Sequence, residues 1–376
     1  MNLGGFRFKV FQSIAVLAKW IPVRRTNYFD LVIVRADSLG DFVIWNDALQ
    51  AYKKKYNGRR VLLICSSIDT PLAQNDRFFD EILSFNGRKI ATKFDYFLVQ
   101  FIKTRSIVAK TVIYPVWERH VIGDFYVHTI KAEEKIAMVG VGRHDFWWHY
   151  YNKKYTTLVN NPPTQNEITA IEYFTQMIVS KDYKYGYNML TVTWREMMLD
   201  CGRYAVIAIS SSVAKKIWEL NKFAAIIDMI PSDYKVVLLG AGEDDVLRAK
   251  QITDSVDNNT RIINLINKTS ILDMISVISK AAFVIGNDSA AVHIAAATHV
   301  PSICVFHGAH FGRFLPYPDH LPYKEFNPHI VFFRMNCYGC GFDCKQPEGI
   351  NFECLHRVSI DMVNNALNEI LRTVSL

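Results

Sequence analysis

The sequence predicts an α/β protein with two doubly wound, Rossmann-like domains. Continuous runs of apolar, β-branched residues alternate along the chain with segments of helical spacing, as expected for parallel strands buried on both faces. The chain has 376 residues, more than the roughly 250 to 300 at which single hydrophobic cores stop growing. Polar residues and glycines directly follow several of these runs. That pattern is typical of ligand sites at the carboxyl ends of parallel strands.

The expected elements divide into two halves. Strands are predicted in the first half at 31–34, 61–65, 96–99, 111–114 and 137–141, and in the second at 206–209, 236–239, 262–264, 283–285 and 303–306. The alternation gives a basic amphipathic segment (1–30), two Rossmann-like domains (31–198 and 199–335), and a Cys-rich loop with a C-terminal helix (336–376).

Composition excludes several classes of protein. Half of the residues are hydrophobic and 21% are charged, so the chain is globular rather than disordered. No apolar stretch approaches the roughly 20 residues that cross a bilayer. The net charge of +7 favours anionic partners. We do not expect nucleic acid to be one of these partners. No complete G-x-G-x-x-G follows a strand, which argues against dinucleotide oxidoreductase chemistry.

The N-terminal segment 5–25 mixes apolar and basic residues. Lys19 and Trp20 interrupt its apolar region, so it is a poor signal peptide. Two interpretations stay open: a basic amphipathic helix on a membrane surface, or a helix packed on the first domain.

The most informative stretch is 284–318. Its apolar run ends in Gly-Asn-Asp-Ser, and an Ala-rich segment containing His293 follows, which predicts a strand, a tight turn and a helix. Asp288 and Ser289 are expected to cap that helix, whose free N–H groups favour a phosphate. A second strand and a loop at 307–313 come next. Alone, this pattern also fits an ordinary α/β crossover.

Two further strand ends carry polar residues. The first predicted strand runs into Arg35, Asp37, Ser38 and Gly40-Asp41. In the second half, the run 204–209 ends in three serines, and a helix predicted to carry Lys215 and Lys216 begins a few residues later. Hydroxyls, backbone N–H groups and an ammonium group together suit a diphosphate. After Leu239, the glycines 240 and 242 and Glu243 are candidates for holding a nucleoside.

Together these motifs resemble those of glycosyltransferase family 9, the heptosyltransferases. Asp-Ser-Ala-Ala-Val-His with the following Ala-Ala-Ala, proline and His-Gly loop is similar to the family signature, in which Ala290 replaces a glycine. Arg35 to Asp41 matches the first strand end without a gap. The resemblance implies the GT-B fold, two facing domains with a central cleft.

The resemblance also implies roles for residues. Asp41 is expected to be the catalytic base. The nucleotide-sugar is expected to contact Ser211, Ser212, Lys216, Glu243, Asp288, Ser289, Ala290 and His293. Arg35, Ser38 and Arg143 are expected to contact the acceptor; Arg143 opens an aromatic and basic stretch suited to sugars and phosphates.

The function implied is inverting transfer of a heptose or related sugar from an ADP-sugar to a lipopolysaccharide core or another glycan, with no cofactor for catalysis. The expected location is the cytoplasm, at the cytoplasmic face of the bacterial inner membrane. Three alternatives stay open: a protein-directed heptosyltransferase, a noncatalytic nucleotide-sugar-binding module, and a sugar-nucleotide epimerase of the same fold.

Four of the seven cysteines cluster near the C-terminus, at Cys337, Cys340, Cys344 and Cys354. Four thiolates in a short Gly-rich segment can ligate one structural Zn or Fe ion. Disulfides are the competing interpretation, disfavoured in the cytosol. Some members of the resembled family have a Cys-rich C-terminal loop, including protein-directed enzymes with an iron site.

Overall fold

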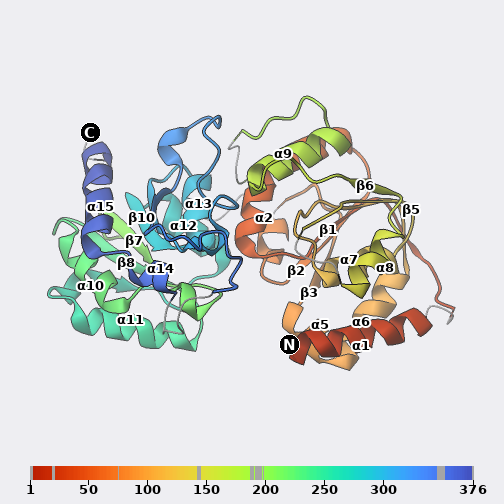
Figure 1. Cartoon of the computed structure of the whole chain (residues 1–376), viewed down its shortest axis with the longest axis horizontal. Coiled ribbons are helices and arrows are strands. Elements are labelled where there is room, and N and C mark those ends of the chain that lie inside the picture. Colours follow the sequence, from red (N-terminus) through yellow and green to blue (C-terminus); the bar gives the residue numbers. More distant parts are fainter. Residues whose placement is uncertain are drawn as a thin grey trace. The chain divides into compact units, whose positions relative to one another are not determined.

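The computed structural model divides the chain into two compact units, residues 1–184 and 185–376. The structure describes residues 3–18, 22–74, 76–141, 145–186, 190, 197, 199–344 and 352–374. The boundary predicted between 198 and 199 lies a short way along the second unit. Each unit has its own sheet (Figure 1). Each also has its own hydrophobic core.

The first unit contains, in its described residues, a six-stranded sheet in the order β3-β2-β1-β4-β5-β6, with every pair parallel. Its strands are β1 (Asn27–Arg35), β2 (Val61–Ser66), β3 (Glu81–Phe85), β4 (Ile107–Tyr114), β5 (Lys131–Met138) and β6 (Thr157–Val159). Its helices are α1 (Leu3–Leu17), α2 (Leu39–Trp45), α3 (Leu49–Lys55), α4 (Thr70–Gln74), α5 (Gly87–Thr92), α6 (Phe94–Arg105), α7 (Val121–Thr129), α8 (Phe146–Asn152) and α9 (Glu167–Ile178).

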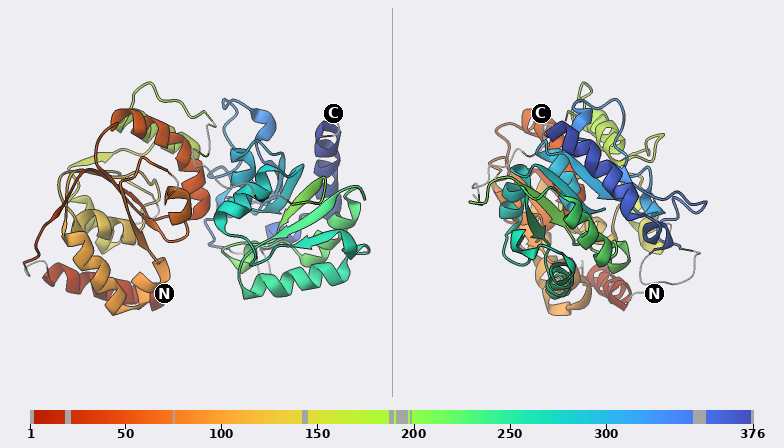
Figure 2. Two further views of the ribbon diagram at one scale, coloured as in Figure 1. Left: turned by 180° about the vertical axis from the view of Figure 1, so that it is seen from behind. Right: turned by 90° about the vertical axis from the view of Figure 1, so that its left-hand side faces the viewer.

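Helices cover this sheet on both faces. Residues of α1, α5, α6 and α7 share one hydrophobic cluster with β1, β2 and β4, while α2 packs against α9. Figures 1 and 2 show α1, α5 and α6 gathered at one end of the unit, near its N-terminus. This two-sided cover explains why β1 is a continuous apolar run.

The second unit repeats the pattern with the described order β12-β11-β10-β7-β8-β9, again parallel throughout. Its strands are β7 (Tyr204–Ala208), β8 (Lys235–Leu239), β9 (Ile262–Asn264), β10 (Phe283–Asn287), β11 (Ser302–Val305) and β12 (His329–Val331). Its helices are α10 (Leu220–Met229), α11 (Glu243–Ser255), α12 (Ile271–Ser279), α13 (Ala290–Ala297), α14 (Glu353–His356) and α15 (Ile360–Val374).

Both sheets have the 3-2-1-4-5-6 strand order of a Rossmann fold when each unit is numbered from its own first strand. The order reverses between β1 and β4 in the first unit and between β7 and β10 in the second. Ligands of such sheets bind outside the carboxyl ends of the strands at this switch point. The predicted doubly wound α/β class is therefore confirmed, and it shows where to look for the sites.

Several expected elements differ from the structure. The strand predicted at 96–99 is wrong, since these residues belong to α6. The short strands β3, β6 and β12 have no counterpart among the predicted strands. A helix predicted to carry Lys215 and Lys216 is only a 3-10 turn, Ala214–Lys216, ahead of α10. Edge strands and short turns carry weak periodic signals, which explains these errors.

The N-terminal helix α1 packs on the first unit through buried Phe8 and Ala15, as one of the two open interpretations expected. Its opposite side exposes Val10, Ile14 and Leu17. Within the described part of the chain, no helix is both long enough and apolar enough to span a bilayer.

Candidate functional site

In the first unit, the loop after β1 is organised around the buried guanidinium of Arg35, which is 1% exposed. Its Nη1 donates to the carbonyl of Pro115 just beyond β4, at 2.8 Å, so the side chain bridges the switch point. Its Nη2 pairs with Asp37 and donates to the backbone oxygen of Asp41 at 3.1 Å. Its burial favours a positioning role over the predicted acceptor contact.

Asp41 lies in the first turn of α2 and forms a capping box with the N-cap residue Ser38. The Asp41 Oδ2 accepts hydrogen bonds from the backbone N–H of Ser38, at 3.2 Å, and from its hydroxyl. Asp41 is partly exposed and Ser38 is exposed. The Asp41 carboxylate therefore lies just beyond the carboxyl end of the central strand β1. The two Ser38 donors orient it, and its partial exposure leaves it accessible to a ligand.

Two further carboxyls beside this loop are buried. Burial raises the pKa of Asp37 to about 7, although the Arg35 guanidinium opposes this and Asp41 reinforces it. Asp69 is fully buried, and neither of its carboxyl oxygens has a hydrogen-bond partner in the described part of the chain. Burial, then the charge of Asp37, raises the pKa of Asp69 to about 8. The base candidate Asp41 therefore lies beside groups that readily keep a proton near neutral pH.

In the second unit, three ionisable side chains meet at the ends of β7, β10 and β11. The Asp288 Oδ2 lies 3.3 Å from Lys216 Nζ and 2.9 Å from His307 Nε2. All three side chains are largely buried, with Lys216 at 11% exposure. The cluster lies at the switch point of this sheet, where the resemblance expects the donor diphosphate.

Protonation within this cluster follows from its hydrogen bonds. Burial alone would raise the pKa of Asp288, but the His307 hydrogen bond and the charge of Lys216 outweigh it and hold the pKa well below its usual range. Burial also lowers the pKa of His307. The His307 Nδ1 accepts from the Ala309 N–H at 3.1 Å, so Nε2 carries the proton and donates to Asp288. The ammonium of Lys216 remains as the cation for an anionic ligand.

The predicted capping of α13 by Asp288 and Ser289 is wrong. Ser289 is the N-cap residue, yet its side chain makes no capping hydrogen bond, and the Asp288 carboxylate turns to Lys216 and His307 instead. Ala290 is the first residue of α13. His293 is buried, with Nδ1 2.7 Å from the Tyr317 hydroxyl. The N–H groups of the first helical turn are thus not taken by these side-chain caps.

Asn287, the last residue of β10, holds the serine loop after β7 through hydrogen bonds to two backbone groups. Asn287 donates through Nδ2 to the carbonyl of Ile209 at 3.0 Å, and its Oδ1 accepts from the Trp218 N–H at 2.9 Å. These bonds fix both ends of the loop that carries Ser211 and Ser212. Ser211 Oγ accepts from the Val213 N–H at 3.4 Å, and Ser212 is exposed.

The loop after β8 is tightly packed. A Cβ at Gly240 would lie 2.8 Å from both the Asp245 carboxyl and the Ser210 hydroxyl. Gly240 therefore has a packing role. Glu243 is the first residue of α11 and is exposed, so its carboxylate is accessible to a ligand.

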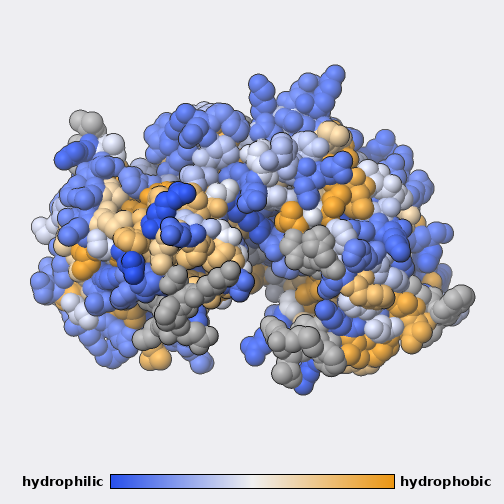
Figure 3. Space-filling view, in the orientation of Figure 1, coloured by the Kyte–Doolittle hydropathy of each residue, from blue (hydrophilic) through white to orange (hydrophobic). Residues whose placement is uncertain are grey.

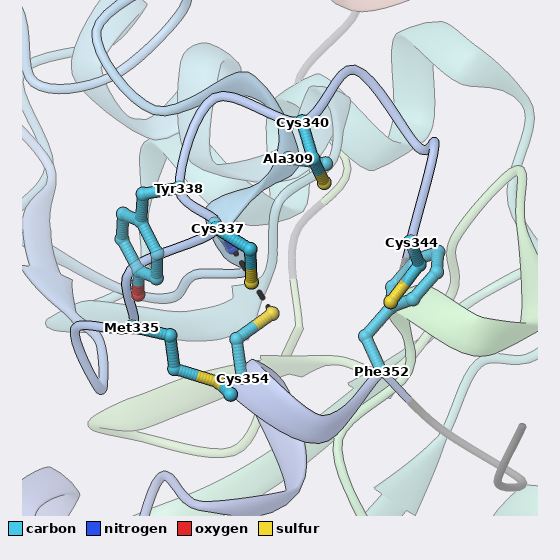
Figure 4. A pocket seen from close by; sticks show the side chains of 9 residues that line it. Ala309, Met335, Cys337, Tyr338, Cys340, Cys344, Phe352 and Cys354 are labelled. Carbon is cyan, nitrogen blue, oxygen red and sulfur yellow. Dashed lines mark hydrogen bonds between the residues drawn. The ribbon is translucent and has the colours of Figure 1, made fainter. Parts of the chain in front are cut away.

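The four clustered cysteines line one apolar pocket, together with Met335, Tyr338, Phe352 and two residues of the loop after β11, Gly308 and Ala309. Figure 4 shows their sulfur atoms turned toward the same hollow. Cys354 Sγ accepts from the Gly308 N–H at 3.3 Å. Burial, then the neighbouring thiols, raises the pKa of Cys354. Among the described residues, no group of three or more Cys, His, Asp or Glu is already arranged to hold a metal.

Arg143 lies outside the described residues, so its predicted acceptor contact stays a prediction. Sequence reasoning assigned no role to Asp37, His307, Asn287 or Asp69. Asn287 ends β10, and Asp37 and His307 lie two residues beyond the ends of β1 and β11, positions that could have singled them out. Asp69 carries no such signal, because its importance comes from burial alone.

Comparison with solved structures identifies the class of fold. A glycosyl transferase family 9 protein from Veillonella parvula DSM 2008 superimposes with a TM-score of 0.70 at 14% identity, covering 94% of this chain and all of that one. The E. coli heptosyltransferase WaaC with ADP-2-deoxy-2-fluoro heptose gives 0.66 at 16% identity over 90% of this chain and 99% of that one. The iron-containing heptosyltransferase TibC, in complex with ADP-D-beta-D-heptose, superimposes with a TM-score of 0.53 at 16% identity. That superposition covers 94% of this chain and 78% of TibC. The fold is therefore the GT-B class of glycosyltransferases.

Sequence comparison narrows the class. Residues 128–324, just over half of the chain, match the profile of glycosyltransferase family 9 (heptosyltransferase). The chain belongs to this family, which confirms the resemblance and the prediction of a glycosyltransferase. Lipopolysaccharide heptosyltransferase 3 of Escherichia coli (strain K12) is 31% identical over 137 residues, which span 36% of this chain and 37% of that protein. The curated relative is thus matched over little more than a third of its length.

Proposed function

We propose that this protein is an inverting glycosyltransferase that transfers a heptose or related sugar from an ADP-sugar to a lipopolysaccharide inner core or another glycan. The observation that carries the proposal is the buried cluster of Lys216, Asp288 and His307 at the switch point of the second unit. The family match and the curated heptosyltransferase relative support the sugar class.

The second unit binds the donor in this proposal. The diphosphate of the ADP-sugar lies against Lys216, the hydroxyls of Ser211 and Ser212, and the first turn of α13 from Ser289 and Ala290 to His293. Glu243 accepts hydrogen bonds from the ribose hydroxyls. Asp288 and His307 hold Lys216 in place, and the cation and N–H dipoles stabilise the charge that develops on the departing ADP. No cofactor takes part in this step.

The first unit supplies the base. Asp41 removes the proton from the acceptor hydroxyl as the oxygen attacks the anomeric carbon from the face opposite the diphosphate. One bond forms between that oxygen and the anomeric carbon, and the bond from the anomeric carbon to the diphosphate oxygen breaks. A single displacement inverts the configuration. Ser38 and Arg143 contact the acceptor, and Arg35 holds the loop that carries the base.

A transfer assay tests the proposal. Purified protein is given ADP-heptose with a heptose-deficient lipopolysaccharide core, and ADP release and the glycan mass are followed. We expect acceptor-dependent ADP release and a product of inverted anomeric configuration. Donor binding without ADP release would indicate a noncatalytic module, and an altered donor without acceptor would indicate an epimerase. Transfer to a polypeptide but not to the core would place the protein among protein-directed enzymes.

The four cysteines around the apolar pocket are proposed to hold one structural Zn or Fe ion. Four thiols from one short segment are a suitable donor set for tetrahedral coordination, and the neighbour of similar fold, TibC, contains iron. Metal analysis of the purified protein checks this: we expect about one metal per chain in the native protein and loss of it in a Cys337→Ser, Cys340→Ser variant. Unchanged metal content in that variant would contradict the site.

We place the protein in the cytoplasm, at the cytoplasmic face of the inner membrane. A lipopolysaccharide core is carried on a membrane-anchored lipid, so an enzyme that acts on it has to reach a bilayer surface. Fractionation of cells that express the protein would check this location, with recovery in the membrane fraction expected at low salt.

A further inference from the structure

The first unit leaves large apolar side chains exposed on two helices, α1 and α6. On α1 these are Val10, Ile14 and Leu17, with exposed fractions of 44%, 42% and 73%. On α6 they are Phe94, Leu98, Val99 and Ile102, with exposed fractions of 40% to 50%. We call these seven side chains the α1–α6 face.

The two helices lie side by side. The Phe11 ring of α1 is 5.2 Å from that of Phe94 and 5.3 Å from that of Phe97, both on α6. At the other end, Arg105 donates from Nη1 to the carbonyl of Ala18 at 2.9 Å. Figure 3 shows hydrophobic surface at the lower right, where Figure 1 draws these helices.

The exposure of this face is not an incidental result of packing. Both helices already bury another side in the core, through Phe8 and Ala15 on α1 and Phe97 and Phe101 on α6. The α1–α6 face is therefore a second apolar side, at a position where a soluble surface usually carries polar residues. Contiguous exposed apolar patches of this kind mark interaction sites.

The surroundings of the face are strongly basic. The described residues 3–18, 22–25 and 86–105 together contain nine Lys or Arg residues and a single acid, Asp95. Arg7, Arg24, Arg25 and Lys103 are exposed, and none of these four forms an ion pair in the described part of the chain. Lys9, by contrast, is paired with Asp145 at 3.4 Å.

The apolar face and the cations around it together indicate which kind of partner binds there. A second copy of the chain packed face to face would bring two sets of cations together, which opposes association. An anionic bilayer offers both an apolar layer and negative head groups, which match an apolar helix side flanked by Lys and Arg. The geometry points to the α1–α6 face as a docking surface for the anionic surface of a lipid bilayer, with both helices lying on the membrane. This inference deepens the membrane location proposed above and rests on it.

Vesicle co-flotation of the full-length protein tests the inference. Vesicles are made either of phosphatidylcholine alone or with about 30% phosphatidylglycerol, a content chosen to give a clearly negative surface. The variant Leu17→Gln, Val99→Gln, Ile102→Gln removes three of the most exposed side chains of the face, at 73%, 49% and 50%. The matched control is Met177→Gln, Val246→Gln, Leu247→Gln, exposed at 60%, 46% and 63% on other helices.

We expect the native protein and the control to bind the anionic vesicles, with the face variant weakened more than about tenfold. Changing Lys103 to Gln should weaken binding about fivefold, since each cation near such a surface contributes about 1 kcal/mol. Equal binding by the face variant and the control would overturn the inference. So would a native protein that ignores vesicles but dimerises through this face, as shown by a monomeric face variant.

Sugar transfer to a lipid-free core acceptor is measured on the same proteins. Vesicle binding needs no turnover, so a protein that floats but transfers nothing would refute the proposed function and leave the docking surface standing. A protein that transfers sugar but binds no anionic vesicle would refute the docking surface alone.

Discussion

At the scale of single residues, the proposed donor site depends on one cation, Lys216. Lys216 lies 3.3 Å from Asp288 and is 11% exposed, so its ammonium group has little freedom and a fixed direction. Asp288 accepts a hydrogen bond from this ammonium group, and His307 holds Asp288 in turn.

We expect Lys216→Gln to weaken ADP binding about 10- to 100-fold, because a charge-assisted hydrogen bond in a largely dry site contributes about 1.5 to 3 kcal/mol. Isothermal titration calorimetry with ADP measures the effect. Lys215→Gln, at the neighbouring position on the same turn, is the matched control and should change affinity less than about twofold. Equal losses in the two variants would contradict the specific role of Lys216.

The buried carboxyl of Asp69 makes the first unit sensitive to pH. Its pKa is raised by burial from 3.8 to about 8 in the folded protein, so the folded state binds a proton that the unfolded state has released. Stability from this group is therefore present at low pH and is lost as the pH rises between about 4 and 8. Asp37 acts in the same direction, because burial raises its pKa to about 7.

We expect Asp69→Asn to raise the free energy of unfolding above that of the native protein by at least about 1 kcal/mol at pH 8, with a clearly smaller gain at pH 5. Urea titrations at the two pH values give the comparison. Asp95→Asn, at an exposed position of the same unit, should show no such dependence. A gain for Asp69→Asn that is the same at both pH values would refute the linkage.

At the scale of elements, Gly240 in the loop from β8 to α11 is required by close packing rather than by backbone conformation. A Cβ at Gly240 would be 2.8 Å from two polar atoms and 2.9 Å from Ile266. We expect Gly240→Ala to destabilise the protein by about 1 to 3 kcal/mol. Gly87→Ala, where an added Cβ meets nothing within 4 Å, should be neutral or slightly stabilising on thermal unfolding. Similar melting temperatures for both variants would show that the neighbours of Gly240 can move to accommodate a Cβ, which would contradict the packing role.

Strands with a continuous apolar run could be predicted from the sequence. The run at 262–264 coincides with β9, and the central strands β1 and β10 extend the predicted ranges by a few residues. The central strand β7 starts two residues before its predicted range and ends one residue short of it. The edge strands β3, β6 and β12 could not be predicted, because half-exposed strands of three to five residues carry little periodicity. The error at 96–99 has a definite cause: exposed Leu98 and Val99 on α6 hide the helical spacing of buried Phe97 and Phe101.

Site residues that lie just beyond the end of a strand could be predicted from the sequence. Contacts that depend on burial and on residues from other strands could not. Asp41 lies beyond β1, Lys216 beyond β7 and Asp288 beyond β10, as the motifs indicated. That Arg35 is buried, and that Asp288 pairs with His307 instead of capping α13, depends on neighbours from other strands. No local pattern contains that information.

At the scale of the whole molecule, two Rossmann-type units divide the proposed reaction. In the proposal, the second unit offers a cation and helix N–H groups to the donor, and the first offers a carboxylate at its own switch point. Sugar transfer requires both, whereas ADP binding requires only the second. This division makes the two functions separable by mutation.

The most direct measurement compares Asp41→Asn with the native protein for ADP affinity and for turnover with donor and acceptor. The account predicts a loss in kcat of about 10²- to 10⁴-fold, with ADP affinity unchanged within about twofold. Thermal unfolding of the two proteins measures the structural share of the loss. A folded Asp41→Asn protein that turns over within about tenfold of the native rate would contradict the assignment of Asp41 as the base.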